Sequence, residues 1–449
     1  MGKNSARISR RDWMKFCAAG VGVASASGWF EQLAHAAKAK KPKRSVILLW
    51  MNGGPSQMDT FDLKPGHENG GPYKEIQTAA PGLKFSEHLP KLAKHAKELA
   101  VIRSMSTKEG DHSRGTFLMR TGRLPQGPIQ YPTLGSFVSK ELGDEKAALP
   151  NFVAIAPYRQ FSPAAYNAGF LGPKYAPLVV GDALQAFRQR QQNQDYADSL
   201  KVQDLDLPTD VDKRHADSRI DILRLMEKEF STSRPGVAVE SHKTAYDRAV
   251  RLMKTEAAKA FNIEEEKDAV RDAYGRNLFG QGCLLARRLV ERSVPFIEVS
   301  ISGTNGGFLG WETHSQNFPR VKQLSEVLDT AWATLISDLK DRGLLDSTLI
   351  VWMGEFGRTP KINRQQGRDH YPNAWTTVLA GGGIKGGQAY GKTSKDGTTV
   401  EEKKVTVADF IATICKASGL DPMKQNQSNV GRPIRLADPG ATPIKEVLS

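Results

Sequence analysis

Residues 45–55 read Ser-Val-Ile-Leu-Leu-Trp-Met-Asn-Gly-Gly-Pro, an uninterrupted apolar run that ends in turn-forming residues. Continuous rather than alternating apolar character is typical of a strand that is covered on both faces, as in parallel sheets flanked by helices. The Asn-Gly-Gly-Pro segment favours a tight turn and therefore ends the strand. This stretch predicts an α/β fold with a fully buried strand.

Further apolar runs of the same kind follow along the chain, at residues 99–102, 152–155, 296–299, 348–353 and 376–380. Between two of them, apolar residues from Val321 to Leu339 recur at three- and four-residue steps, which predicts a helix that Gly343 ends. Alternation of helices and buried strands predicts a parallel-rich central sheet with helices on both faces.

Residues 182–277 have a different character, because they are rich in Gln, Arg, Lys, Asp and Glu and show only weak periodicity. This composition predicts a mostly helical, solvent-facing insertion. We expect the insertion to belong to one α/β domain that spans residues 37–449.

The N-terminal residues have the features of an export signal. The pair Arg10-Arg11 precedes a weakly apolar, Ala/Gly-rich stretch, and Ala34-His35-Ala36 offers a site for signal peptidase. Two adjacent arginines favour the twin-arginine route, so residues 1–36 are predicted to be a signal peptide that the twin-arginine export machinery recognises. We expect the mature protein to be periplasmic or otherwise exported across a bacterial inner membrane. The alternative is an amphipathic N-terminal helix of the folded protein, which the glycines of this segment disfavour.

The composition excludes several classes of protein. Hydrophobic residues make up 39% and charged residues 25% of the 449, as in globular domains rather than collagen-like or low-complexity chains. Three cysteines are too few for a disulfide framework. The mature chain has no apolar run of transmembrane length. The net charge of +14 is spread along the sequence without a nucleic-acid motif, so no nucleic-acid partner is expected.

Polar and titratable residues gather where the predicted strands end, which is where sheets of this type bind ligands. The relevant runs are Asp111-His112-Ser113-Arg114, Trp311-Glu312-Thr313-His314, Gly354-Glu355-Phe356-Gly357-Arg358 and Arg368-Asp369-His370. Imidazoles together with carboxylates suit zinc, manganese or iron, whereas oxygen ligands alone suit magnesium or calcium. Structural roles stay open as well, since His112 fits a hydrogen-bonded turn and Ser113 fits a helix cap.

Several motifs together resemble one known family. They are residues 52–65 (Asn-Gly-Gly-Pro-Ser-Gln-Met-Asp-Thr-Phe-Asp-Leu-Lys-Pro), Asp-His-Ser-Arg-Gly at 111–115 with Thr-Gly-Arg at 121–123, Trp-Glu-Thr-His at 311–314, Gly-Glu-Phe-Gly-Arg-Thr-Pro at 354–360 and Arg-Asp-His-Tyr-Pro at 368–372. The chain resembles the exported, sulfatase-like domain-of-unknown-function 1501 family of the alkaline phosphatase superfamily, from Val46 to about Leu420. The resemblance implies an alkaline phosphatase/sulfatase-like fold.

The resemblance also implies roles for individual residues. In the superfamily an Asp after the first strand binds a metal, and Asn52 stands at that place here. Ser113 with Arg114 matches the nucleophile at a helix start, and Glu312 with His314 resembles a metal-binding pair at shorter spacing. An Asp-His metal pair corresponds to Glu355-Phe356, so one imidazole is missing. His370 matches the last histidine, and the absence of Cys-x-Pro-x-Arg excludes formylglycine chemistry.

The leading hypothesis is an exported metal-dependent hydrolase of a phosphate, sulfate or related ester in a small molecule or glycan. Its cofactor would be a divalent ion: zinc, manganese, calcium or magnesium. Candidate metal ligands are Glu312, His314 and His370, with Asn52, Glu355 and Asp369 as weaker ones. Candidate catalytic residues are Ser113, His112 (which would replace the missing imidazole), Arg114 and Arg358, the arginines holding anionic oxygens. The competing hypothesis is a non-catalytic binding or structural protein on a degenerate sulfatase-like fold.

Overall fold

The computed structural model describes residues 44–181, 196–202, 205, 207–234, 236–302 and 310–449. The chain divides into two units, Met1–Lys43 and Arg44–Ser449, and the α/β domain occupies the second. The predicted signal peptide, residues 1–36, lies outside the described residues.

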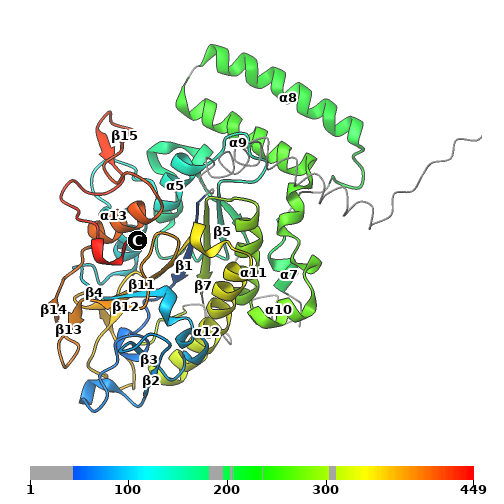
Figure 1. Cartoon of the computed structure of the whole chain (residues 1–449). Helices are drawn as coiled ribbons and strands as arrows, with labels where there is room; N and C mark the ends of the chain where they lie inside the picture. The colour runs from blue at the N-terminus through cyan, green and yellow to red at the C-terminus, as the bar shows by residue number, and fades with distance from the viewer. Residues whose placement is uncertain (1–43, 182–195, 203–204, 206, 235, 303–309) are drawn as a thin grey trace, which may run out of the picture. The chain divides into compact units, whose positions relative to one another are not determined.

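An eight-stranded sheet with the order β12-β4-β11-β8-β1-β7-β5-β6 forms the centre of the domain (Figure 1). Strand β1 pairs in parallel with β7 on one side and with β8 on the other, whereas β11 runs antiparallel to both β4 and β8. The predicted parallel-rich sheet is therefore confirmed. The strands are β1 (Ser45–Met51), β4 (Leu99–Met105), β5 (Phe152–Ile155), β6 (Leu178–Val180), β7 (Phe296–Ile301), β8 (Thr348–Met353), β11 (Trp375–Gly381) and β12 (Gln388–Tyr390).

Helices cover both faces of this sheet, which explains the uninterrupted apolar character of β1. Alternate residues of a strand point to opposite faces, and Ile47 and Leu49 enter one core while Leu48 and Trp50 enter the other. The first core contains residues of α11 and α12, and the second contains residues of α4, α5 and α13. These helices are α4 (His112–Thr121), α5 (Leu134–Leu142), α11 (Leu278–Glu291), α12 (Asn317–Asp341) and α13 (Val407–Ala417).

Helix α12 matches the helix that the apolar spacing predicts. It ends at Asp341, and Gly343 follows two residues later with a φ of 67°. This left-handed conformation is favourable for glycine and is common just beyond a helix end, which is why the helix stops there.

Smaller elements surround the sheet. Two-stranded sheets pair β2 (Glu75–Gln77) with β3 (Lys84–Ser86), β9 (Gly357–Arg358) with β10 (His370–Tyr371), β13 (Lys392–Thr393) with β14 (Val400–Glu402), and β15 (Gln425–Gln427) with β16 (Pro433–Arg435). The remaining α-helices are α3 (Pro90–Ala93), α7 (Tyr196–Ser199), α8 (Lys213–Ser233), α9 (Val237–Lys254) and α10 (Asp268–Tyr274). The last four lie within residues 182–277. No helix of the described residues is long and apolar enough to span a membrane.

The direction of β11 decides where the candidate site forms. Strands β1, β4, β7 and β8 run the same way, so their carboxyl ends and the loops after them share one edge of the sheet. Because β11 runs the opposite way, its amino end lies at this same edge. The segment before β11, which contains His370, is thereby brought to the loops that follow the other strands.

Candidate metal centre

His112 stands at the start of α4, in the loop region that follows β4. Asp111 caps this helix, since its side chain accepts a hydrogen bond of 3.0 Å from the backbone N–H of Arg114. The imidazole of His112 stacks on Phe161, with ring centroids 4.1 Å apart, and lies 5.0 Å from the ring of Phe356. The helix cap and the two aromatic rings therefore fix the direction in which His112 points.

Glu312 is held in place through its backbone neighbour and through its carboxylate. The backbone N–H of the preceding residue, Trp311, donates to the carbonyl of Asn52 at 2.8 Å, and the indole of Trp311 is completely buried. The guanidinium of Arg358 donates to both carboxylate oxygens of Glu312, at 2.9 and 3.4 Å. A charge-assisted pair of this kind fixes the orientation of the carboxylate.

His370 lies on β10, which pairs with β9 so that His370 is opposite Arg358. Arg368, two residues before His370, is completely buried and donates two hydrogen bonds to the buried carboxylate of Asp59, at 2.8 and 3.1 Å. Its guanidinium also donates to backbone carbonyls of Asn69 and Thr359. The segment before His370 is therefore anchored to the loop that follows β1.

Three imidazoles have the same hydrogen-bonding arrangement at their Nδ1 atoms. Nδ1 of His112 lies 2.7 Å from Oε1 of Glu355, Nδ1 of His314 lies 2.7 Å from Oδ1 of Asp369, and Nδ1 of His370 lies 2.8 Å from the carbonyl of Gly110. Carbonyl and carboxylate oxygens can only accept, so each Nδ1 carries the proton. In the neutral rings the lone pair is then on Nε2.

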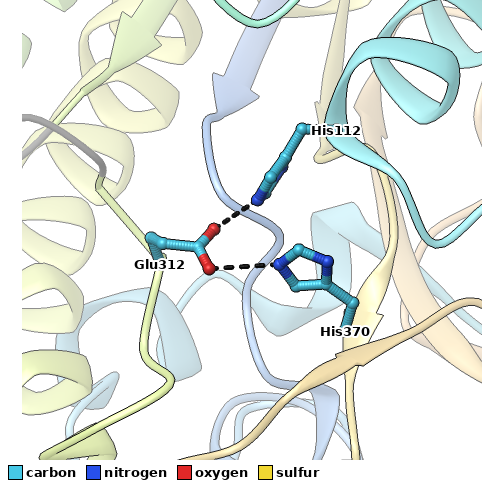
Figure 2. A group of neighbouring side chains, drawn as sticks. All are labelled: His112, Glu312 and His370. Atoms are coloured by element: carbon cyan, nitrogen blue, oxygen red, sulfur yellow. Dashed lines mark hydrogen bonds and ion pairs between the residues drawn. The ribbon is translucent and has the colours of Figure 1, made fainter.

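The three Nε2 atoms converge on Glu312. Those of His112 and His370 lie 2.5 and 3.1 Å from different oxygens of this carboxylate, as Figure 2 shows. Nε2 of His314 also contacts Glu312 and lies 3.0 Å from Nε2 of His370. The potential ligand atoms of His112, Glu312 and His370 all lie within 4.8 Å of one another.

This donor set fits a divalent transition-metal ion. Two ligands bound at about 2.0–2.1 Å in a tetrahedral site lie roughly 3.3 Å apart, close to the separations of the Nε2 atoms of His314 and His370 and of His370 from Glu312. Two Nε2 lone pairs at 3.0 Å repel each other unless a proton or a cation lies between them. An acceptor at the other ring nitrogen is the usual support of a metal-binding histidine.

The pKa values of His112 and Glu312 without a bound cation show that a proton occupies the site that a cation would take. Burial disfavours the charged form of His112, but its hydrogen bonds to Glu312 and Glu355 outweigh burial and raise its pKa to about 9. Burial likewise opposes ionisation of Glu312, yet His112, His370 and Arg358 together hold its pKa far below the ordinary value. A metal ion would therefore displace a proton from His112 on binding, as is general for imidazole ligands.

Glu355 supports the site through the hydrogen bonds that its carboxylate accepts. Its Oε1 accepts from Nδ1 of His112 and, at 2.9 Å, from the backbone N–H of Gly53. Its Oε2 is buried and has no hydrogen-bond partner among the described residues. The close approach of these loops requires small residues, because a Cβ at Gly54, whose φ is 77°, would lie 2.7 Å from the carbonyl of Phe356.

The remaining predicted site residues lie as follows. The side chain of Asn52 is buried between the indole N–H of Trp50, from which it accepts at 2.7 Å, and Ser302, to which it donates at 3.0 Å. Ser113 is exposed at the start of α4. Arg114 forms a two-pronged ion pair with Glu109. Arg358 directs its donors to Glu312 and to backbone carbonyls, so in this structure it orients the carboxylate.

Two contributors to the site, Phe161 and Asn363, have no recognisable signal in the sequence. Phe161 covers His112, and Asn363 donates to both the carbonyl of His314 and the carboxylate of Asp369. Asp59 belongs to the motif at residues 52–65, but the sequence does not indicate that it anchors Arg368. Asp59 and Arg368 lie more than 300 positions apart in the sequence. Their pairing depends on the fold and leaves no local pattern.

A family model matches nearly the whole chain. The family model described as "Protein of unknown function (DUF1501)" matches residues 43–448. No curated protein matches the chain.

The likeness to solved structures is remote. The PsFucS1 sulfatase from Pseudoalteromonas sp. is 14% identical with a TM-score of 0.40, over 87% of this chain and 70% of that one. The lipoteichoic acid synthase LtaP from Listeria monocytogenes is 9% identical with a TM-score of 0.40, over 89% and 76%. A mutant of the TAB5 alkaline phosphatase with bound magnesium is 12% identical with a TM-score of 0.35, over 85% and 99%. Identities this low concern the fold alone.

Proposed function

Because the chain belongs to the family described as "Protein of unknown function (DUF1501)", we propose its function from the site itself. We propose that His112, His314, His370 and Glu312 bind one divalent transition-metal ion, and that the site hydrolyses a phosphate, sulfate or related ester. The observation that carries the proposal is the convergence of three Nε2 atoms on one carboxylate, with an oxygen acceptor at each Nδ1.

A metal ion bound there would supply Lewis acidity toward an ester oxygen and lower the pKa of a bound nucleophile. The residues of the chain would do the rest. Glu355 and Asp369 keep the Nδ1 protons of His112 and His314 in place, and Arg358 holds Glu312. The amino end of α4 favours an anionic group beside His112 through the helix dipole. Ser113, exposed one residue further on, is the candidate nucleophile.

The substrate that we propose is a small-molecule or glycan ester outside the cytoplasm, reached after twin-arginine export. Of the metals considered from the sequence, zinc and manganese suit this donor set better than calcium and magnesium, because imidazole nitrogens outnumber oxygens in it. Asp369 and Glu355 would orient imidazoles rather than bind the ion.

Metal-dependent stabilisation tests the binding part of the proposal. A ligand that binds only the folded state raises the melting temperature. We expect zinc or manganese to raise the melting temperature of the chelator-treated wild type, and His370→Asn to lose this gain while it folds with near-native stability in chelator. His215→Asn is the matched control, because His215 is exposed on α8 and lies outside the donor set. Equal gains in wild type and His370→Asn would mean that His370 is not a ligand.

Hydrolysis of aryl phosphates and aryl sulfates tests the catalytic part. We expect metal-dependent turnover by the wild type that His112→Ala and His370→Ala abolish and His215→Ala leaves unchanged. Bound metal in protein purified without chelator, together with the absence of turnover for every ester tried, would contradict the catalytic part and leave the binding part standing.

A second candidate function, a metal-binding protein without catalysis, is favoured by one specific feature. Four protein ligands close a tetrahedral site, whereas catalytic zinc sites keep one position open for water or substrate. The side chain of Asn52 is also engaged by Trp50 and Ser302, which favours a single ion. The hydrolysis experiment distinguishes the two candidates.

A further inference from the structure

Helix α8 is unusual among the long helices because none of its 21 residues is buried within the described part of the chain. Four large apolar side chains on it are strongly exposed: Ile222 (58%), Leu225 (69%), Met226 (64%) and Phe230 (47%). They follow each other at steps of three, one and four residues, so they form one stripe along the helix. We call these four residues the α8 stripe.

The α8 stripe is not the side of the helix that packs inside the domain. Figure 1 shows α8 beside α9, and an ion pair of 2.5 Å between Asp217 and Lys254 joins the two helices. The apolar residues of α8 that are half-buried are Ala216, Ile220 and Leu223. On a helical wheel their mean direction lies about 100° from that of the stripe. The strongly exposed apolar side chains of α8 are therefore directed away from its half-buried ones.

A stripe of large apolar side chains on an otherwise charged helix is a feature of interaction surfaces. Most of the stability of a helix in a protein comes from packing of an apolar face against another element. The α8 stripe lacks such packing within the described domain, so a partner would stabilise α8 itself.

The charges along the stripe favour a second copy of the same helix as that partner. Arg219 lies at the amino end of the stripe and Glu229 at its carboxyl end, and both are exposed. Two α8 helices that cross in antiparallel orientation bring Arg219 of each copy to the end where Glu229 of the other lies. Parallel packing would bring like charges together at both ends. A two-fold axis perpendicular to the helices produces this antiparallel arrangement and closes the interface on two copies.

A lipid surface fits the same stripe less well. Helices that lie on anionic membranes carry Lys and Arg on their polar face. The polar positions of α8 mix both signs, since Asp217, Asp221, Glu227 and Glu229 accompany its basic residues. We therefore propose that α8 forms the interface of a two-fold symmetric dimer of this chain, in which two α8 stripes pack against each other in antiparallel orientation.

Sedimentation velocity of the full chain over a concentration series tests the proposal. One helix from each copy makes a small interface, so we expect a dimer with a dissociation constant of roughly 1–100 μM. Met226→Glu should weaken the dimer by at least about tenfold, because it buries a charge at the centre of the stripe. Arg224→Glu is the matched control, since it places the same residue about 200° round the helix from Met226. It should leave the dissociation constant unchanged.

A charge swap tests the orientation. Arg219→Glu should weaken the dimer, and adding Glu229→Arg should restore it. Failure of the double variant to restore the dimer would rule out the antiparallel arrangement. A wild type that stays monomeric throughout the series, or a dimer that Met226→Glu does not affect, would overturn the proposal. Binding of the monomer to anionic vesicles through the stripe would also overturn it and assign the stripe to lipid.

Discussion

The pair of Asp369 and His314 is the most exposed part of the candidate metal centre. Their side chains are 56% and 44% exposed and lie 2.7 Å apart. Asp369 accepts from Nδ1 and thereby directs Nε2 of His314 toward Glu312 and His370. At this exposure the pair adds little to the stability of the fold, so its effect on metal binding can be separated from any effect on folding.

We expect Asp369→Ala to lower metal affinity by about 10–100-fold, as removal of a group that orients a metal-binding histidine generally does. The free energy of unfolding in chelator should change by no more than about 0.5 kcal/mol, because the site is exposed. Competition with a chromophoric chelator measures the affinity. Asp341→Ala, which removes an exposed carboxylate at the end of α12, is the control. Unchanged affinity in Asp369→Ala would show that Asp369 does not orient a ligand.

Among the secondary-structure elements, the segment before β10 depends on one buried ion pair. Arg368 and Asp59 are both completely buried, and Asp59 also accepts from Ser56 and Asn317. Arg368→Met should destabilise the fold by about 3–5 kcal/mol, because it leaves a buried carboxylate without its cation. Urea denaturation measures this loss. Lys361→Met, at an exposed position of the same segment, should cost less than about 0.5 kcal/mol.

The ion pairs between α11 and residues 263–266 predict a pH dependence of stability. Burial opposes ionisation of Glu266, but its hydrogen bonds and attraction to Arg287 and Arg288 outweigh burial and lower its pKa below the ordinary 4.5. A pKa lowered in the folded state stabilises the fold above the unfolded value and loses this contribution as the pH falls. Glu266 therefore stabilises the protein near neutral pH and not in acid.

We expect Glu266→Gln to lower the free energy of unfolding by roughly 1–3 kcal/mol near neutral pH. The difference from wild type should shrink as the pH falls below about 4.5. Urea denaturation at several pH values checks both statements. Glu256→Gln, whose ion pair with Lys259 is exposed, should change little at any pH. A difference that persists unchanged into acid would show that the charge of Glu266 is not the cause.

For the molecule as a whole, the proposed metal centre and the predicted export signal would be connected through the order of folding and export. The twin-arginine route carries folded proteins, so a metal ion held by three distant segments, as we propose, would be acquired before export. We expect Arg10→Lys with Arg11→Lys to leave full-length precursor in the cytoplasm, whereas Arg7→Lys should leave export unchanged. Cell fractionation and determination of the new N-terminus check this. Processing of the double variant near residue 36 would exclude the twin-arginine route.

Much of the fold follows from the sequence because a strand that is buried on both faces has a recognisable local composition. Continuous apolar runs identified the strands at residues 45–51, 152–155 and 348–353, and the position of Gly343 predicted the end of α12. A strand covered on both faces needs apolar residues at successive positions, so its sequence reports its surroundings. The types of residue at the site were also visible, since imidazoles and carboxylates stand where the predicted strands end.

The arrangement of the candidate metal centre was decided by tertiary structure. In an all-parallel sheet the residues before β11 would lie about 24 Å away, at the opposite edge, because β11 has seven residues with a rise of about 3.4 Å each. The antiparallel direction of β11 brings His370 to His112 and Glu312 instead. Strand direction depends on pairing between distant segments, which local composition does not record.

The hydrogen-bond partners of individual side chains also depend on contacts between distant segments. The sequence determined that Arg358, Asn52 and Glu355 stand near strand ends, but their partners come from segments remote in the chain. Arg358 holds Glu312, Asn52 contacts Ser302, and Glu355 accepts from His112. Which ring nitrogen of each histidine is free depends on the acceptor at the other nitrogen, and only the folded chain places that acceptor. Residue types were therefore determined by the sequence alone, whereas their directions and pairings required the fold.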